Sequence, residues 1–546
     1  MDWKLTADLL VIVAYFGAIV GIGVYFSRRS GSMQDFALGG RSIPWWAVLA
    51  SILAAEISAG TFFGTPGEGY ALKNYTYAQL LLGYLMARVV VSAVFIPAYY
   101  RHNVVSIYEF LDQRFGVRTR RVASAVFLVT RVLASGARLW VPTVLAVIIW
   151  NLNFPDQQLS TWGTFWICAV SLVVVTILTA LYTAIGGIKA VIWTDVIQIV
   201  VLFCALGFSL WFLLGHIQGG WEGAKQHLTG AHDLKLFQWS GDHPADTLWG
   251  KIKSIFETEY TMWAALFGSL FTTMATHGTD QDMVQRMLTA KNKKQSAMAT
   301  ILSGLADIPV VLAVLTIGIL LSVYYGPGGI GSSMLPLNPA GKVDNMKVFP
   351  YFVMTEMPGG LRGLVIAGVL ATTMGSLGTA MNSLATSYVR DFHFRWFGEP
   401  KDEAGKVRAV RKATVLFAIF LILVGLGTAL VKAHNPNLRI IPIILGSFGY
   451  TYGSLLGVFL LALFVPGRGS DRGNIMAMVA GFLGVAYLSG LDGGFASMFG
   501  GTGLPRPDWM PTLEFPWWIL CGTVITFCVA VCFPSPARTA AEEKEM

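Results

Sequence analysis

The apolar segment from Trp45 to Gly64 places the strongest constraint on this chain. It is long enough to cross a bilayer, because about 20 apolar residues span the hydrocarbon core. Its middle nevertheless holds Glu56, Ser58 and Thr61, and a carboxylate at that depth costs about 3 kcal/mol or more unless it meets a partner or an ion path. Unwound backbone is tolerated in a membrane only where it lines a cavity. Because transporters build their sites from such discontinuous helices, the segment predicts a transporter.

The composition predicts an all-α polytopic membrane protein. Hydrophobic residues make up 54% of the chain and charged residues only 13%, against roughly 25% charged residues in soluble domains. The net charge of +8 does not indicate a nucleic-acid partner, since the cations lie in short loops between apolar stretches. The five cysteines lie inside apolar stretches without ligand spacing, so we expect neither disulfides nor a metal site. About 13 spans are predicted, over residues 6–27, 44–66, 76–100, 121–150, 162–184, 188–215, 260–284, 297–324, 361–388, 410–431, 439–465, 474–490 and 515–533.

The distribution of loop cations predicts how the chain crosses the cell (inner) membrane. The loops expected on the cytoplasmic side carry most of the Lys and Arg residues, including the 390–412 loop and the loop that contains Arg286. The N-terminus is then outside and the C-terminus inside. The apolar run from Leu9 to Phe26 is too long for a cleavable signal peptide. The tail after Pro534 is too short for an output domain, which argues against a transporter-derived sensor.

Two sets of five spans have the same organisation. Residues 44–215 and residues 260–465 each begin with a span interrupted by polar residues, and in the second set the interruption runs from Thr272 to Asp280. Two broken helices at matching positions predict an inverted five-plus-five repeat with the binding site between its halves. Residues 1–43 and 466–546 are then peripheral.

Five motifs in the right order give the chain its resemblance to a known family. They are Phe36–Arg41 (FALGGR), Tyr108–Gly116, Tyr182–Gln198, Thr279–Arg286, and Met374–Ser376 with Asn382 and Ser383. On these motifs the chain resembles the sodium/solute symporter family. The resemblance implies the fold of sodium-coupled amino-acid transporters, alternating access, and sodium-driven uptake of a small polar organic solute. It implies sodium as the coupling ion and no organic cofactor, with the lipid bilayer and the solute as partners, no nucleic acid, and function as a monomer.

The resemblance also implies where sodium binds. Carbonyl and hydroxyl oxygens satisfy a hard cation, and Gly375 stands where relatives usually carry a hydroxyl. Asp195 and Thr379 match a second ion or coupling site, but Gly375 and Gly378 remove hydroxyls from it. We therefore expect Asp195 to tune the first site, unless it only forms a structural pair with Lys189. The residues that match the main sodium site are Ala54, Ile57, Thr372, Gly375 and Ser376.

The substrate region is marked by two intramembrane carboxylates, Glu56 and Asp307. Burial disfavours their charged form unless a cation is near. An amine-bearing, amino-acid-like solute fits this requirement best. The rival is a carboxylate-bearing solute docked on Arg131 or Arg138, which lie two helical turns apart on one face. Structural pairing of the carboxylates with these arginines or with Arg88 stays open as well. The candidate substrate-binding residues are Glu56, Ser58, Thr61, Gln79, Thr273, Thr276, His277, Asp307, Arg131 and Arg138.

Two other functions share parts of this pattern. Proton-coupled transport would use Glu56, Asp195 or Asp307 as the carrier of the proton. An intramembrane enzyme would use His277 and Asp280, spaced i and i+3, as an acid–base pair. No nucleophile motif or metal-ligand cluster accompanies that pair, so the sequence argues against an enzyme.

Overall fold

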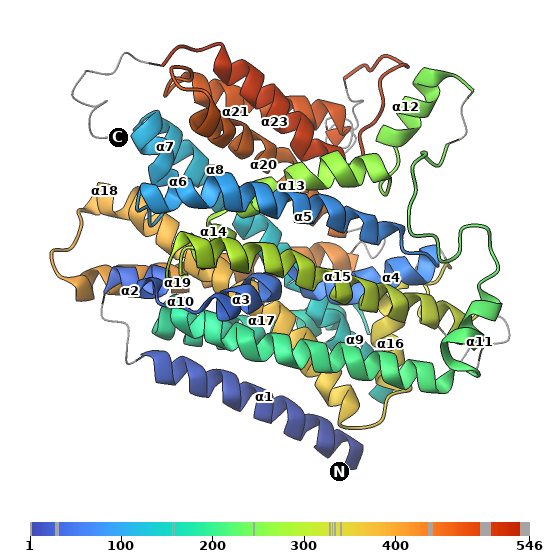
Figure 1. The fold of residues 1–546 in the computed structure, drawn as a ribbon. Coiled ribbons are helices and arrows are strands. Elements are labelled where there is room, and N and C mark those ends of the chain that lie inside the picture. Colours follow the sequence, from blue (N-terminus) through green and yellow to red (C-terminus); the bar gives the residue numbers. More distant parts are fainter. Residues whose placement is uncertain are drawn as a thin grey trace.

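The computed structural model describes residues 3–27, 32–154, 157, 159–243, 246–326, 329, 331, 335–338, 341–434, 440–491 and 504–535. Most helices run side by side along one long axis, with α1 on one flank of the bundle and α21 and α23 on the opposite flank (Figure 1). Extended pairing in the described residues is limited to isolated bridges such as Ile43 with Ala290.

The helices in the first half of the chain are α1 (Trp3–Ser27), α2 (Met33–Leu38), η1 (Gly39–Arg41), α3 (Trp45–Glu56), α4 (Ala59–Leu72), η2 (Thr76–Gln79), α5 (Leu80–Val90), η3 (Val91–Phe95), α6 (Ile96–Arg101), α7 (Tyr108–Arg114), α8 (Val117–Arg138), α9 (Trp140–Asn153), α10 (Thr161–His216), α11 (Gly220–His227) and α12 (Leu248–Phe256). Those in the second half are η4 (Ala264–Ser269), α13 (Leu270–Gly278), α14 (Gln281–Met287), α15 (Lys293–Tyr324), α16 (Asn345–Thr355), α17 (Leu361–Tyr388), η5 (Val389–His393), α18 (Phe394–Phe397), α19 (Glu403–His434), α20 (Ile440–Phe464), α21 (Gly473–Leu488) and α23 (Phe515–Val531).

The predicted spans all fall on helices, but the helices begin and end at other residues than the predicted spans. Within the described residues, 7 helices are long and apolar enough to cross a membrane, or up to 8 if a bent pair counts as one span. The number is below 13 partly because α21, α23 and the described apolar part of α20 are shorter, and partly because α10 joins two predicted spans. α10 turns at Gly187, whose φ is 61°. A Cβ there would lie 2.8 Å from the carbonyl oxygen of Phe36, so the turn requires glycine.

The predicted break in the second span is confirmed. α3 ends at Glu56, α4 begins at Ala59, and the two are bent by 63°. The amide of Ser58 donates to the carbonyl of Glu56 (3.0 Å) instead of continuing the helix to Ala54. The hydroxyl of Ser58 accepts from the amide of Thr61 (3.4 Å) and caps α4. The carbonyls around the break thereby lose their regular helical donors.

The second predicted interruption is present but shorter than predicted, because only Thr279 and Asp280 separate α13 from α14. Residues from Thr272 to Gly278 are helical and form most of α13. The hydroxyl of Thr272 donates to the carbonyl of Gly268 (2.9 Å), which satisfies it within its own helix. The helix ends only at Gly278, and the side chain of Asp280 then accepts from the amide of Asp282 (2.8 Å) to cap α14.

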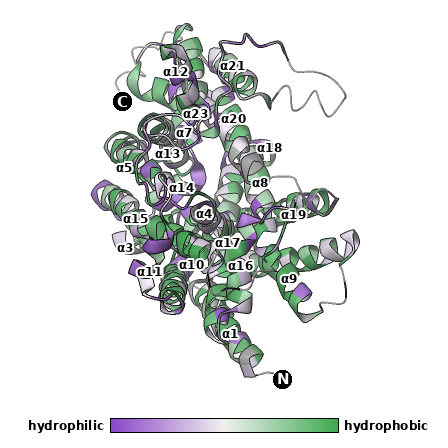
Figure 2. Cartoon of the chain, turned by 90° about the vertical axis from the view of Figure 1, so that its right-hand side faces the viewer, coloured by the Kyte–Doolittle hydropathy of each residue, from purple (hydrophilic) through white to green (hydrophobic). Residues whose placement is uncertain are grey.

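Helix α1 lies on the outside but is fixed at one end. Leu10 and Val13 are about two-thirds exposed, and apolar residues cover α1, α9 and α10 on the flanks of the bundle (Figure 2). Asp8 is buried at the start of α17. Its carboxylate accepts from the amides of Gly360 (2.8 Å) and Gly363 (2.7 Å) and from Nε of Arg362 (2.6 Å). An acid at a helix N-terminus is electrostatically favourable, so Asp8 ties α1 to α17.

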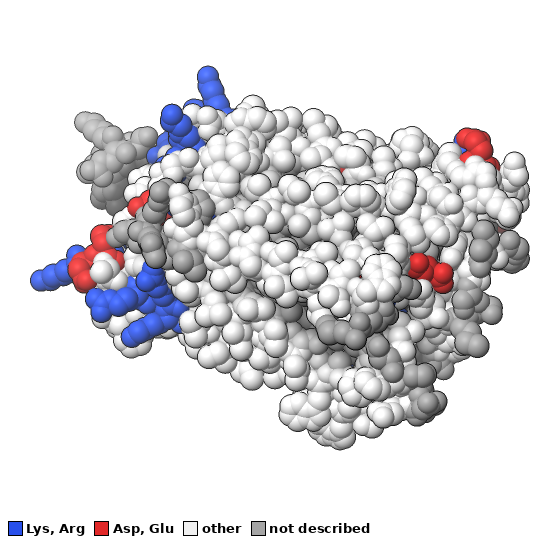
Figure 3. All heavy atoms as spheres, turned by 90° about the horizontal axis from the view of Figure 1, so that it is seen from below, with Lys and Arg blue, Asp and Glu red and all other residues white. Residues whose placement is uncertain are grey.

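Exposed cations gather at one end of the bundle. Figure 3 shows Lys and Arg concentrated at the end that carries α2 and α18 in Figure 1. Exposed cations from the 390–412 segment are Arg395, Lys401, Arg408 and Lys412. Arg286, predicted to be a loop cation, is instead fully buried. That prediction was wrong because α14 packs into the interior beside α3 and α17.

Candidate functional site

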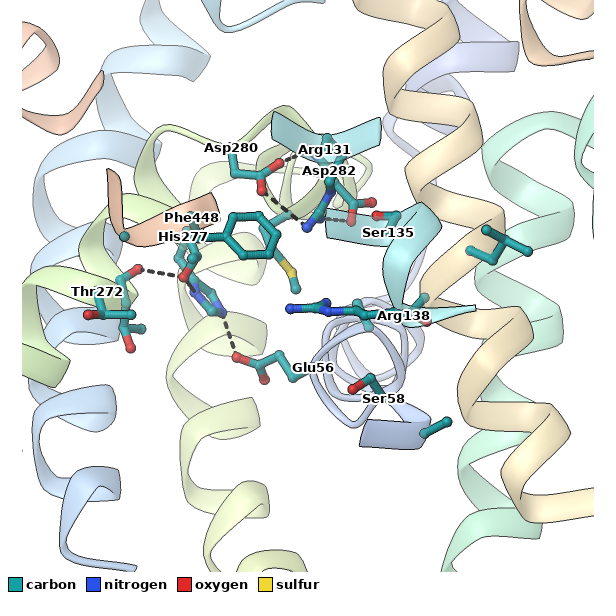
Figure 4. A pocket seen from close by; sticks show the side chains of 18 of the residues that line it. Glu56, Ser58, Arg131, Ser135, Arg138, Thr272, His277, Asp280, Asp282 and Phe448 are labelled. Carbon is teal, nitrogen blue, oxygen red and sulfur yellow. Dashed lines mark hydrogen bonds and ion pairs between the residues drawn. The ribbon is translucent and has the colours of Figure 1, made fainter. Parts of the chain in front are cut away.

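A cavity of about 240 Å³ lies at the break between α3 and α4. Its wall is completed by residues from α5, α8, α13, α14, α17, α20 and α23, so segments far apart in the sequence meet there (Figure 4). The side chains of Glu56, Arg138 and His277 point toward the centre of the space in Figure 4. Its polar lining residues are Glu56, Ser58, Tyr84, Arg131, Ser135, Arg138, Thr272, Thr273, Thr276, His277, Asp280, Asp282, Thr373 and Ser376.

The cavity includes seven of the ten predicted substrate residues, namely Glu56, Ser58, Arg131, Arg138, Thr273, Thr276 and His277. The other three lie outside its lining. Gln79 accepts from the amide of Gln238 (3.2 Å), which ties it to an outer loop. Thr61 sits in the first turn of α4, and Asp307 is covered by Arg88. Phe448 and Asp282 are lining residues that sequence reasoning missed. No motif marks Phe448, whereas Asp282 lies in the motif Thr279–Arg286, which could have indicated it.

Arg88 supplies the cation that the two carboxylates require. Its guanidinium is fully buried, pairs with both Glu56 and Asp307, and donates to the hydroxyl of Ser303 (2.8 Å). Nε2 of His277 lies 2.8 Å from Oε1 of Glu56. A buried charge is tolerated when it is paired and hydrogen-bonded. The structure therefore gives both carboxylates partners from the protein itself.

The two arginines of α8 share a face, as the seven-residue spacing predicts, but they differ in their partners. Arg131 pairs with Asp282 and lies 3.4 Å from Asp280. Arg138 forms no ion pair within 4.0 Å in the described part of the chain, and its guanidinium lies 5.1 Å from the ring centre of Phe448. A guanidinium over an aromatic face keeps its hydrogen-bond donors available. Arg138 therefore offers an anion-binding group inside the cavity.

His277 and Asp280 do not form the acid–base pair that an enzyme would need. His277 contacts Glu56, whereas Asp280 lies beside Arg131 and accepts from the hydroxyl of Tyr452 (2.6 Å). Each group is thus held by other partners.

Two of the predicted sodium residues, Ala54 and Gly375, lie against each other. A Cβ on Gly375 would lie 3.4 Å from the carbonyl oxygen of Ala54, so the break after α3 faces this part of α17. Ile57 forms the C-cap of α3. The hydroxyl of Ser376 donates to the carbonyls of Thr372 and Thr373 (3.0 Å each). A hydroxyl that donates within its own helix keeps lone pairs for a cation, so this arrangement suits sodium.

Asp195 is paired with Arg286 instead of Lys189. Lys189 pairs with Asp35 (3.0 Å). One carboxylate oxygen of Asp195, Oδ2, accepts from Ser51 Oγ (2.5 Å) and from Nη1 of Arg286 (2.8 Å). The other guanidinium nitrogen of Arg286 donates to the hydroxyl of Thr379, so a protein cation stands between the two residues predicted for a second ion. Sequence reasoning missed this role, although Arg286 ends the motif Thr279–Arg286 and follows Asp282 at i+4.

The family model for the sodium:solute symporter family matches residues 36–481. The chain belongs to this family. It is 27% identical over 491 residues to the sodium/sialic acid symporter NanT of Aliivibrio fischeri, covering 88% of each chain. It is 26% identical to the human sodium-coupled monocarboxylate transporter 2, covering 84% of this chain and 68% of that one. It is 28% identical to the rat sodium/glucose cotransporter 2, covering 93% and 74%.

Solved structures show the same fold. A sodium-coupled sialic acid symporter in a substrate-bound outward-open state aligns with a TM-score of 0.75 at 23% identity, over 96% of this chain and 97% of that one. The nucleobase-cation-symport transporter Mhp1 aligns with a TM-score of 0.52 at 13% identity, over 94% and 98%. The chain is therefore a membrane-embedded, sodium-coupled solute symporter and not an enzyme.

Proposed function

We propose that the protein couples sodium entry to the uptake of a small solute that carries a carboxylate group. The observation that carries this proposal is Arg138, a guanidinium without an acid partner in the described residues, directed into the cavity. A planar guanidinium binds a carboxylate through two parallel hydrogen bonds. A neutral hexose or a simple amine would leave this charge unpaired.

The opposite wall favours a solute that also donates hydrogen bonds. Oε1 of Glu56 is held by Arg88 and His277, whereas Oε2 has no hydrogen-bond partner in the described residues. A hydroxyl or ammonium group of the solute would satisfy Oε2. An amine alone fits less well than the sequence suggested, because Arg88 already offsets the charge of Glu56. Two similar proteins are named for sialic acid and for monocarboxylates, which both carry a carboxylate.

For the ion, we propose one sodium per cycle. Its ligands are the carbonyls of Ala54 and Ile57 together with Thr372 and Ser376 on α17, where a break in one helix faces hydroxyls on another. The guanidinium of Arg286 takes the place of a second cation beside Asp195 and Thr379. We also propose that the cation-rich end is cytoplasmic, which sets the N-terminus outside and the C-terminus inside.

Uptake of radioactive sodium into liposomes that contain the purified protein tests this function. A sugar acid, a monocarboxylate, an α-amino acid, a neutral hexose and a simple amine would each be added outside at equal concentration. We expect the carboxylate-bearing solutes to accelerate sodium entry, with one sodium counted per labelled solute. Acceleration by the hexose or the amine alone would reject the carboxylate assignment. Solute uptake driven by a proton gradient without sodium would reject sodium coupling.

A further inference from the structure

The space beside Gly375 is filled by an oxygen from another helix. A Cβ on Gly375 would lie 2.6 Å from Oε1 of Gln198, 3.3 Å from Oδ1 of Asp195 and 3.4 Å from the carbonyl oxygen of Ala54. Two of these oxygens come from α10 and one from the end of α3. All three converge on α17 at the residue where the family resemblance leads us to expect a hydroxyl ligand for sodium.

These oxygens lack the donors that buried oxygens require. Gln198 is 2% exposed and Asp195 is fully buried. Neither Oε1 of Gln198 nor Oδ1 of Asp195 has a hydrogen-bond partner within the described ranges. In a regular helix the amide of Ser58 would donate to the carbonyl of Ala54. Here it donates to the carbonyl of Glu56 instead. Unpaired buried oxygens are costly, and a group of them facing one point is suited to a hard cation.

We propose that Gln198 supplies the sodium ligand that is missing at Gly375. This inference rests on the proposed sodium site and names a further residue of it. An amide oxygen is a good ligand for hard cations and is neutral, so it replaces a neutral hydroxyl without changing the charge of the site. Arg286 holds Oδ2 of Asp195, which leaves Oδ1 facing the same point. Gln198 therefore completes the site from α10.

The same geometry makes residues 198 and 375 mutually dependent. A Cβ at 375 only 2.6 Å from the amide oxygen cannot coexist with Gln198 in its present position. A serine introduced by G375S must push the amide aside, so it adds one hydroxyl oxygen and removes one amide oxygen. The sodium affinity of G375S should therefore stay close to that of the unmodified protein. Replacement of Gln198 should therefore lower the sodium affinity only in proteins that retain Gly375.

Sodium-induced thermal stabilisation of the full-length protein in detergent tests this dependence without a known solute. Sodium chloride is titrated against choline chloride at constant ionic strength, and the sodium concentration for half-maximal stabilisation is measured. We expect Q198A to raise that concentration about tenfold, because one oxygen ligand of a charged ion is lost. In the G375S background, we expect the same Q198A change to have an effect of less than about twofold. The matched control is Q285A, which removes another buried amide, one that donates to the carbonyl of Ala37 (2.6 Å), and should leave the sodium midpoint unchanged.

The outcomes separate the ligand role from the proposed function. If Q198A has the unmodified midpoint, or if its effect is the same with and without G375S, Gln198 is not a ligand. If Q198A does not fold, Q198E keeps an oxygen at the same place, and a raised sodium midpoint in that variant overturns the proposal. If the unmodified protein shows no stabilisation specific to sodium, the proposed sodium site itself fails and the ligand assignment fails with it.

Discussion

Two guanidiniums near the cavity have opposite surroundings. Arg88 is enclosed by Glu56, Asp307 and Ser303. Arg138 lies over the ring of Phe448 and has no carboxylate within ion-pair distance among the described residues. Removing the guanidinium of a buried ion pair leaves uncompensated acids behind, whereas removing a guanidinium without an acid partner leaves none. The comparison therefore separates an arginine that holds helices together from one that is available to a solute.

The largest expected effect is on folding. Arg88→Gln leaves Glu56 and Asp307 buried without their cation, which should cost about 3–5 kcal/mol of stability. Membrane yield and the melting temperature in detergent measure this loss. Combining the change with Glu56→Gln and Asp307→Asn removes the stranded charges and should restore much of the stability. A melting temperature of Arg88→Gln equal to that of the unmodified protein would show that Arg88 is not structural.

The next effect is on solute binding. Arg138→Gln removes the proposed carboxylate partner and should weaken solute affinity about thirtyfold, which corresponds to about 2 kcal/mol. Its melting temperature without solute should not fall, since no ion pair is lost. The preferred solute of the liposome assay is titrated at saturating sodium. Arg138→Lys keeps the charge but loses the planar fork, so its solute affinity should lie between those of the unmodified protein and Arg138→Gln. Equal affinities for all three proteins would contradict the comparison.

A smaller effect is expected at the proposed sodium site. There the comparison is between a hydroxyl that is proposed to bind the ion and a similar hydroxyl that is not. Ser376→Ala removes a hydroxyl that we propose as a sodium ligand and should raise the sodium concentration for half-maximal transport about fivefold, or about 1 kcal/mol. Ser383→Ala is the matched control. Its hydroxyl also donates to a carbonyl of α17 (Ala380, 3.0 Å) but lies two turns further along the helix. An equal response of both variants would mean that the site is misplaced.

The smallest effect is expected at Gln79, which lies outside the surroundings of both Arg88 and Arg138. Gln79 is bonded to the outer loop at Gln238 and does not line the cavity. Gln79→Ala should change solute affinity by less than about twofold, as expected for a site without direct contact. The solute titration used for Arg138 measures it. A large loss of affinity would mean that the cavity extends to Gln79 in η2 in another state of the transport cycle.

Local chemistry could be predicted from the sequence, and long-range pairing could not. The break at Glu56 follows from small and polar residues in an apolar span, and it is where the sequence places it. The second break is confined to the end of the predicted stretch, at Thr279 and Asp280. The threonine hydroxyl of Thr272 bonds its own helix, which the sequence pattern does not reveal.

Pairing between distant segments escaped sequence reasoning for a different reason. The partner of Asp195 lies 91 residues away in Arg286, and the partners of Arg88 lie 32 and 219 residues away. Charge counting along the chain placed Arg286 in a loop because it lies near the end of an apolar stretch. Which arginine neutralises which acid is decided only when the helices pack. The spacing of Arg131 and Arg138 did predict a common face, but not that one would be paired and the other free.

The contact of Asp8 with α17 also determines an order of events during synthesis. α1 leaves the ribosome before α17, and the amides that Asp8 accepts from belong to residues 352 and 355 positions later. Until α17 is made, the carboxylate near the start of the chain has no native partner, and the helix that carries Thr372 and Ser376 has no cap. This contact can therefore close only after the helices between α1 and α17 have been made, so removing α1 would disturb α17 although hundreds of residues separate them.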